Sequence, residues 1–203
     1  MIKNVIFDIG GVIVKFKKET YLKPLELDEE TEIFLRDKIL FTDEWFKLSI
    51  GTSSEQEFLD NVAKTYPNYL ELASSVFKIE TLDKLLPVYT KTIKLVEQLK
   101  KKGYRLFVIS DMEEHGIVYM EHAVPNINEL FDDIIYSCRV GMVKKDGNVF
   151  DNAIERFNVV PEETLFIDDV QANLDQASKR GIHTFQFTNP DVHVKELESM
   201  LLK

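Results

Sequence analysis

Carboxylate, hydroxyl and ammonium side chains follow several apolar runs of this sequence, close to the point where each run ends. One run ends at Asp8, another at Ser110 and a third at the pair Asp168-Asp169, while Lys144 lies in a loop after a fourth. Two adjacent carboxylates at the end of a buried strand repel each other unless a cation lies between them. Hard divalent cations prefer such oxygen ligands. We therefore expect a divalent cation between Asp8 and the later acidic pair.

The remaining side chains of this set suit an anion beside that cation. A hydroxyl such as Ser110 and an ammonium such as Lys144 can hold a phosphate group. Backbone N–H groups around the glycine pair after Asp8 would add donors, as they do in phosphate-binding nests. A carboxylate that faces a phosphoryl group of neutralised charge can attack phosphorus and form an aspartyl-phosphate. The set thus predicts phosphoryl chemistry at Asp8.

Each of these residues alone also has a simpler structural explanation. Asp8 could close a strand-to-helix turn, Ser110 could begin a helix, and Lys144 could be a solvated loop residue. The pair Asp168-Asp169 could be a helix cap with a solvated neighbour. Their occurrence together, each at a strand end and in this order along the chain, favours the chemical interpretation.

The elements that would position these residues alternate along the chain. Strand-like runs of β-branched and aromatic residues occupy residues 5–8, 105–110, 133–137, 164–169 and 183–187. Helical periodicity occupies residues 88–102, 149–157 and 172–180. Alternating strands and helices predict an α/β fold with a doubly wound parallel sheet, in which the carboxyl ends of the strands face the ligand crevice.

Residues 15–87 differ from the rest of the chain, because they contain helical spacing and no convincing strand. The clearest helices span residues 31–40 and 54–65. We expect a helical cap domain at 15–87, inserted between a first core segment at 1–14 and the remainder of the core at 88–203. Its aromatic residues, including Trp45, Phe46 and Phe58, are expected to form the core of a small helical bundle.

Composition limits the possible partners and surroundings. The net charge of −10 argues against binding to nucleic acid or to an anionic membrane surface. The single cysteine, Cys138, excludes an intrachain disulfide framework and is expected to be a buried, inert thiol. Without a signal-peptide pattern or a run long enough to span a bilayer, we expect a cytoplasmic protein that does not bind membranes.

Four motifs resemble those of the haloacid dehalogenase-like (HAD) hydrolase superfamily. They are Phe7-Asp8-Ile9-Gly10-Gly11-Val12, Ile109-Ser110-Asp111, Gly141-Met142-Val143-Lys144 and Phe166-Ile167-Asp168-Asp169. The first looks closest to the FDxGxV branch, which includes sugar-phosphate phosphatases. The resemblance implies a Rossmann-like core, a helical cap domain after the first strand, Mg²⁺ dependence and hydrolysis of small phosphate esters.

The resemblance also implies roles for individual residues. Asp8 corresponds to the nucleophile and to a metal ligand, and the carbonyl of Gly10 to another ligand. Asp169 supplies a metal carboxylate, and Asp168 a second or outer-shell one. The phosphate-binding residues implied in the same way are Ser110, Asp111, Lys144 and Gly11.

The sequence departs from the family pattern at three positions. Gly10 stands where many of these phosphatases have an Asp that protonates the leaving group, a function worth roughly 10²–10⁴-fold in rate. A carboxylate of the cap domain or a water could supply the proton, the substrate could need little help, as a sugar 1-phosphate does, or turnover could be slow. Lys145 replaces a usual Pro, which would loosen the loop, and Asp111 replaces a frequent Asn, which would weaken phosphate binding unless it points away.

Two other functions stay open. A non-catalytic binding or regulatory protein would retain the fold and the site without useful turnover. A 2-haloacid dehalogenase would share the Asp nucleophile but need no metal, and the pair Asp168-Asp169 would repel its carboxylate substrate. The sequence names neither the substrate nor the oligomeric state, for which monomer and homodimer are both expected possibilities.

Overall fold

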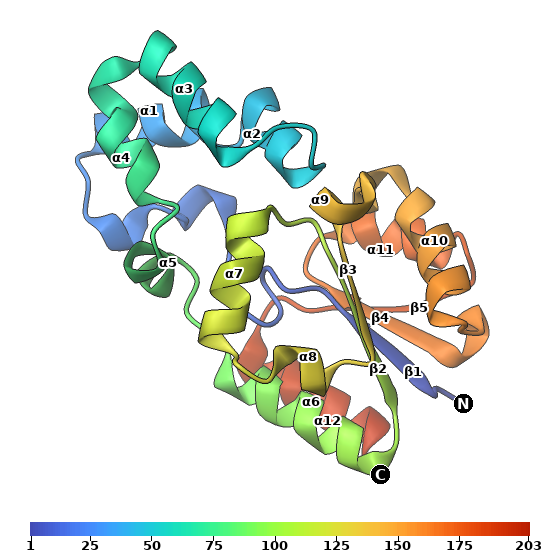
Figure 1. Ribbon diagram of the computed structural model, residues 1–203. Helices are drawn as coiled ribbons and strands as arrows, with labels where there is room; N and C mark the ends of the chain where they lie inside the picture. The colour runs from blue at the N-terminus through green and yellow to red at the C-terminus, as the bar shows by residue number, and fades with distance from the viewer.

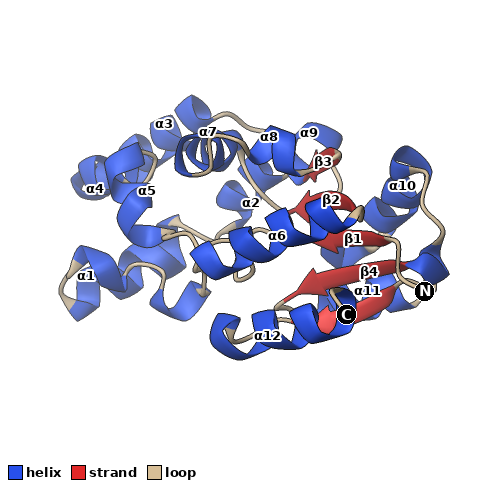
Figure 2. Cartoon of the chain, turned by 90° about the horizontal axis from the view of Figure 1, so that it is seen from below, coloured by secondary structure: helices blue, strands red, loops and turns tan.

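The computed structural model describes residues 1–203 and contains one parallel sheet of five strands in the order β3-β2-β1-β4-β5. The strands are β1 (Asn4–Phe7), β2 (Arg105–Ser110), β3 (Asp133–Tyr136), β4 (Thr164–Asp168) and β5 (His183–Gln186). Every neighbouring pair is parallel, so all carboxyl ends meet at one edge of the sheet (Figure 2). The predicted α/β fold with a doubly wound parallel sheet is confirmed.

Helices cover both faces of this sheet (Figure 1). Outside the region 15–87 they are α6 (Thr90–Lys102), α7 (Glu114–Ala123), α8 (Ile127–Leu130), α9 (Ser137–Val140), α10 (Asn148–Phe157), α11 (Gln171–Ser178) and α12 (Pro190–Leu201). Alternate residues of β1 point to opposite faces: Val5 and Phe7 belong to the hydrophobic cluster under α6 and α12, and Ile6 to the cluster under α10 and α11. This two-sided burial explains why the central strands β1, β2 and β4 are mostly apolar.

Residues 15–87 form a helical insertion at the carboxyl edge of the sheet (Figures 1 and 2). Its helices are α1 (Glu29–Phe34), α2 (Asp43–Ser49), α3 (Glu55–Thr65), α4 (Leu70–Ser75) and α5 (Ile79–Leu85), with short 3₁₀ turns at Lys18–Thr20, Lys23–Leu25 and Pro67–Tyr69. The larger hydrophobic cluster runs from the sheet into this insertion without a break. The division into a core and a separate cap domain therefore stays a proposal.

Capping residues in the sequence mark the end of α6 and the start of α3. Gly103 at the end of α6 has φ = 92°, a conformation that residues with a Cβ rarely adopt. Ser54 begins α3 with a capping box, because its side chain accepts from the N–H of Glu57 and its own N–H donates to the Glu57 carboxylate. None of the helices combines the length and the apolar composition that crossing a bilayer requires.

One predicted helix differs in detail. The sequence spacing predicts a single helix over residues 31–40, but α1 starts earlier, at Glu29, after the cap Asp28. It then widens into a π-helical turn over Leu35–Ile39. The reason for the earlier start is that the Asp28 carboxylate accepts from the N–H of Thr31.

Candidate active site

The central strand β1 brings the predicted site residues together. Phe7 pairs with Ile167 of β4 on one side and with Val108 of β2 on the other. The residues that follow these strands therefore meet at one edge. Asp8, Ser110 and Asp169 all line a cavity of about 580 Å³ between the sheet edge and the helical insertion.

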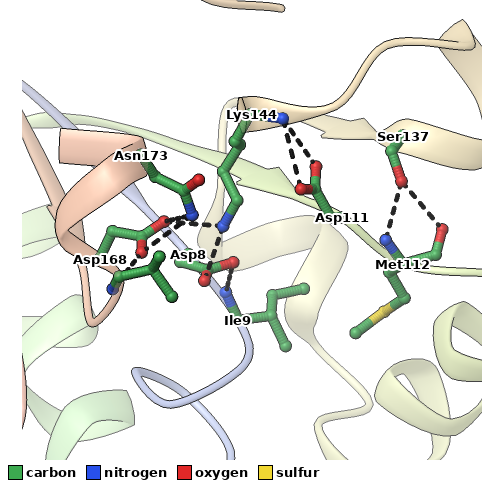
Figure 3. Close-up of polar contacts among 9 residues, drawn as sticks. Asp8, Ile9, Asp111, Met112, Ser137, Lys144, Asp168 and Asn173 are labelled. Carbon is green, nitrogen blue, oxygen red and sulfur yellow. Dashed lines mark hydrogen bonds and ion pairs between the residues drawn. The ribbon is translucent and has the colours of Figure 1, made fainter. Parts of the chain in front are cut away.

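Lys144 lies at the centre of this cluster (Figure 3). Its Nζ is 2.7 Å from Asp8 Oδ2 and 2.7 Å from Asp168 Oδ2. The lysine side chain is only 3% exposed, so the ammonium exchanges its water for two carboxylates. The predicted alternative of a solvated loop lysine is wrong.

Asp168 is held on all sides by the protein. Its Oδ1 accepts from the N–H of Val170 at 2.7 Å and from Asn173 Nδ2 at 3.2 Å, and its Oδ2 accepts from Asn173 Nδ2 at 3.1 Å as well as from Lys144. Asn173 reaches it from the first turn of α11. With its oxygens engaged in this way, Asp168 is well placed to fix the position of Lys144.

Asp169 lies directly over Gly11. Gly11 has φ = 75°, and a Cβ there would lie 2.5 Å from Asp169 Cγ, so only glycine fits beneath this carboxylate. Ligand oxygens of Asp8, Asp168 and Asp169 all lie within 4.8 Å of one another. Such a group of hard oxygen donors is of a kind that suits Mg²⁺.

The backbone of the glycine pair offers fewer free N–H donors to a phosphate than the sequence suggests. The N–H of Gly11 donates to the carbonyl of Val14 at 2.8 Å, so this donor is already engaged, and the phosphate contact expected of Gly11 stays a prediction. Gly10 lines the cavity, and its carbonyl as a metal ligand likewise stays a prediction.

Ser110 and Asp111, at the end of β2, differ in orientation. Ser110 is 2% exposed and lines the cavity without a side-chain hydrogen bond to the protein. The Asp111 carboxylate accepts from the backbone N–H of Lys144, at 3.1 and 3.3 Å (Figure 3). Asp111 thereby anchors the loop that carries Lys144, and its charge is directed to that loop.

The loop after Lys144 is also fixed at its next residue. The Lys145 carbonyl accepts from Gln176 Nε2 at 3.1 Å, and the Lys145 ammonium lies 4.3 Å from the ring centroid of Phe46 in the helical insertion. A lysine at this position therefore gains a cation–π contact. The loosening expected from the missing Pro is not seen in these contacts.

The charges of the cluster act strongly on one another. Burial raises the pKa of Asp8 well above its usual value, and the nearby Asp168 and Asp169 add to this, while Lys144 opposes it. Burial and Asp168 likewise raise the pKa of Asp169, to about 6. Burial alone would lower the pKa of Lys144, but the attraction of Asp8, Asp168 and Asp111 outweighs it and raises that pKa. A bound divalent cation would favour the ionised carboxylates.

The rest of the cavity is built mostly by the helical insertion. Its aromatic lining residues are Phe16, Tyr21, Phe41, Trp45 and Phe46. Trp45 and Phe46 were expected mainly in the bundle core, and the sequence does not say which aromatic residues line a pocket; in the structure both face the cavity. Two polar lining residues, Glu113 and His115, did not emerge from the sequence, because nothing in an ordinary helix start marks a residue as facing a cavity.

Comparison with known proteins places this geometry in a family. The profile described as haloacid dehalogenase-like hydrolase matches residues 2–181. The chain is 29% identical over 215 aligned residues to mouse acyl-CoA dehydrogenase family member 10, covering 98% of this chain but only 19% of that protein. It is 27% identical over 199 residues to D-ribitol-5-phosphate phosphatase of Bacteroides thetaiotaomicron, covering 93% of each chain.

Solved structures share the fold. A predicted HAD-like family hydrolase from Porphyromonas gingivalis superimposes with a TM-score of 0.78 at 24% identity, covering 100% of this chain and 99% of the other. A HAD family enzyme from B. thetaiotaomicron, in complex with magnesium and inorganic phosphate, superimposes with a TM-score of 0.73 at 21% identity, covering 92% and 94%.

Proposed function

The chain belongs to the haloacid dehalogenase-like hydrolases, and we propose on this basis that it is a Mg²⁺-dependent phosphatase of small phosphomonoesters, with Asp8 as nucleophile. The observation that carries the proposal is the contact between Asp8 and Lys144 at 2.7 Å, in a cavity that also contains Ser110 and Asp169. A carboxylate and an ammonium at this separation can face the phosphorus and a phosphoryl oxygen of one substrate.

In the proposed reaction Lys144 and Ser110 bind oxygens of the phosphoryl group. An Asp8 oxygen attacks phosphorus, the bond from phosphorus to the ester oxygen breaks, and the leaving alkoxide takes up a proton from water. Water then attacks the aspartyl-phosphate, which releases inorganic phosphate and regenerates the Asp8 carboxylate. Asp168 and Asn173 keep Lys144 in place through both steps.

The residues present fit a bound Mg²⁺. Asp8 and Asp169 would hold it with the carbonyl of Gly10, while the hydrogen bonds of Asp168 favour an outer-shell role for that residue. When bound, the ion would neutralise phosphoryl charge and favour the ionised form of Asp8. The magnesium and phosphate in the B. thetaiotaomicron structure support this assignment.

The substrate class is proposed from a relative. A D-ribitol-5-phosphate phosphatase aligned over nearly the full length of both chains supports a sugar-phosphate-like substrate. The paired acidic residues and the buried Lys144 favour this over a haloacid, whose carboxylate would meet Asp169 beside Asp8 without a cation between them.

The test is release of inorganic phosphate from a panel of phosphomonoesters, with Mg²⁺ and with excess EDTA. We expect Mg²⁺-dependent turnover, and loss of at least about 10³-fold in Asp8→Asn. The fold should survive, because an amide oxygen can still accept from Lys144, which keeps Asp168 as its partner. Circular dichroism checks the fold.

Other results would change the assignment. Turnover by Asp8→Asn equal to that of the wild type would exclude Asp8 as nucleophile. No phosphate release from any ester, with intact fold and bound Mg²⁺, would favour the non-catalytic binding protein. Metal-independent chloride release from a 2-chloroacid would favour the dehalogenase.

A further inference from the structure

The cavity has a second polar group that the proposed reaction leaves unused. Glu113 directly precedes α7, and His115 lies in the first turn of that helix. Both line the same cavity as Asp8 and Lys144. Their side chains are 16% and 11% exposed, respectively, so the cavity is their main access to solvent.

Aromatic rings from the helical insertion surround this polar pair. The His115 ring lies 4.4 Å from Phe77 and 5.6 Å from Trp45, measured between centroids. The ring of Tyr21 packs against Phe16 and Phe41, at 5.4 and 5.6 Å between centroids. Burial raises the pKa of the Tyr21 hydroxyl, and the charge of Glu113 raises it further. Glu113 and His115 are thus polar groups in a largely aromatic part of the wall.

The Glu113 carboxyl has few partners within the protein. Besides its own backbone N–H, the carboxyl has His115 Nε2 at 3.5 Å, which is too long for a strong hydrogen bond. Burial raises the pKa of Glu113 to about 7 and lowers the pKa of His115 to about 4. Burial therefore favours the neutral form of both the carboxyl and the imidazole. Both groups can donate and accept hydrogen bonds in these neutral forms.

A ligand with hydroxyl groups would satisfy such a pair. Each hydroxyl donates one hydrogen bond and accepts others, and its carbon skeleton can pack on aromatic rings. A cationic group suits the pair less well, because burial disfavours the charged form of Glu113 that would attract it. An unsubstituted alkyl chain would leave the polar pair without partners.

We propose that Glu113, with His115 beside it, hydrogen-bonds hydroxyl groups of the substrate's organic part and so selects polyol or sugar phosphates over alkyl phosphates of equal length. This inference rests on the proposed phosphatase function and assigns specificity to a residue outside the phosphate end of the cavity.

The experiment compares D-ribitol 5-phosphate with n-pentyl phosphate, which has the same number of chain carbons but no hydroxyl groups. The readout is the ratio of kcat/KM for the polyol ester to that for the alkyl ester. We expect Glu113→Leu to lower this ratio by about tenfold to a hundredfold, because a site built for hydroxyl groups loses its partner. Glu113→Gln, which keeps a donor and an acceptor, should lower it less.

The matched control is Glu114→Gln. Glu114 is the next residue, is exposed and pairs with Arg139 at 3.1 Å, away from the cavity lining. This variant should leave the ratio unchanged. A fall in the ratio for Glu114→Gln as large as that for Glu113→Leu would show a general effect on α7 and overturn the assignment.

A binding measurement separates this inference from the proposed function. In the Asp8→Asn background, the binding affinity for the same two esters is measured by calorimetry. Glu113→Leu should weaken the binding of D-ribitol 5-phosphate, but not that of n-pentyl phosphate, by about tenfold to a hundredfold. Suppose that the wild type turns over both esters, but Glu113→Leu changes neither the kcat/KM ratio nor the ratio of binding affinities for the two esters. The inference then fails and the proposed phosphatase function stands. If binding changes selectively while no ester is hydrolysed, the phosphatase fails and the inference stands.

Two further outcomes overturn the inference directly. A wild-type preference for ethanolamine phosphate over both esters would show a site for an ammonium group. An equal fall in kcat/KM for both esters in Glu113→Leu, with an intact fold, would show that Glu113 acts on the phosphate end or on the packing of the helical insertion.

Discussion

At the residue scale, Gly10 and Gly11 have opposite requirements. A Cβ at Gly10 would meet Phe16 at 3.6 Å, an ordinary contact, whereas one at Gly11 would collide with Asp169. Only Gly11 is therefore needed as glycine for steric reasons. Gly10 leaves room in the cavity where an acid for the leaving group could stand.

This room makes the missing acid testable by Gly10→Asp. We expect kcat/KM for an alkyl phosphate to rise by about 10²-fold or more, because its leaving alkoxide needs a proton. The rate on p-nitrophenyl phosphate should rise much less, since that leaving group is stable as an anion. Phosphate release from the two esters is the measurement.

Gly10→Asn is the control for Gly10→Asp, because it adds the same volume without an acid and should raise neither rate. Equal increases on both esters would contradict the account of a missing acid.

Glu113 predicts a pH-dependent stability. Its pKa of about 7 in the folded chain lies above the ordinary 4.5, so the folded state binds the proton more tightly than the unfolded state. The stabilising contribution is present in full below pH 4.5 and is lost as the pH rises through 7. The shift corresponds to about 3 kcal/mol.

Glu113→Gln removes this titration, with His115 and Tyr21 still facing the position. Between pH 4.5 and pH 8 the wild type should lose up to about 3 kcal/mol of unfolding free energy relative to the variant. Urea denaturation of both chains at these pH values measures the difference. Parallel pH profiles would show that Glu113 titrates normally.

At the element scale, α2 of the helical insertion is joined to the core at α9. The hydroxyl of Ser137 accepts from the N–H of Met112 at 2.9 Å and donates to the carbonyl of Ser49 (Figure 3 shows the core side). Gly51, with φ = 70°, lies so close that a Cβ would be 1.9 Å from the Cys138 carbonyl oxygen. This junction holds the aromatic wall of the cavity against the sheet edge.

Ser137→Ala should weaken the junction. It leaves a buried N–H of Met112 and the carbonyl of Ser49 without their partner, at a cost of about 1–3 kcal/mol. Denaturant unfolding measures this loss. Ser178→Ala, at an exposed position at the end of α11, is the control and should change stability by less than about 0.5 kcal/mol. A similar loss in both variants would show that the junction contributes nothing specific.

Strands were easier to predict from this sequence than the contacts between helices. The run Leu106–Ile109 is uniformly apolar and is bounded by Arg105 and Ser110, so the extent of β2 could be predicted correctly. Glu113 and Ser137 could not be identified, because their roles depend on packing between α2, α7 and α9, which no local pattern encodes. The pairing of Lys144 with Asp168 likewise depends on β4 lying beside β1.

At the scale of the whole molecule, the acidic cluster joins two adjacent strands of the sheet. Asp8 follows β1 and Asp169 follows β4, and these strands are neighbours. Mg²⁺ bound by both should therefore stabilise the entire cooperative fold, by about 2.7 kcal/mol at a hundredfold excess over its Kd. For a chain of this size we expect a rise in Tm of about 5–10 °C.

Thermal unfolding with and without Mg²⁺, at constant ionic strength, checks this. In Asp169→Asn the rise should be largely lost, whereas Asp175→Asn, at an exposed position of α11, should keep it. An undiminished rise in Asp169→Asn would place the ion elsewhere.

The central place of β1 also bears on how the chain is made. Among the five strands of the sheet, β1 is made first; its neighbour β2 follows only after the helical insertion, and its other neighbour β4 only after much of the core as well. During translation both edges of β1 stay unpaired until Arg105–Ser110 has emerged, and the edge that pairs with β4 stays open until Thr164–Asp168 has also emerged. A nascent chain arrested before that point would carry an open, apolar strand edge, to which chaperones that recognise exposed apolar segments could bind.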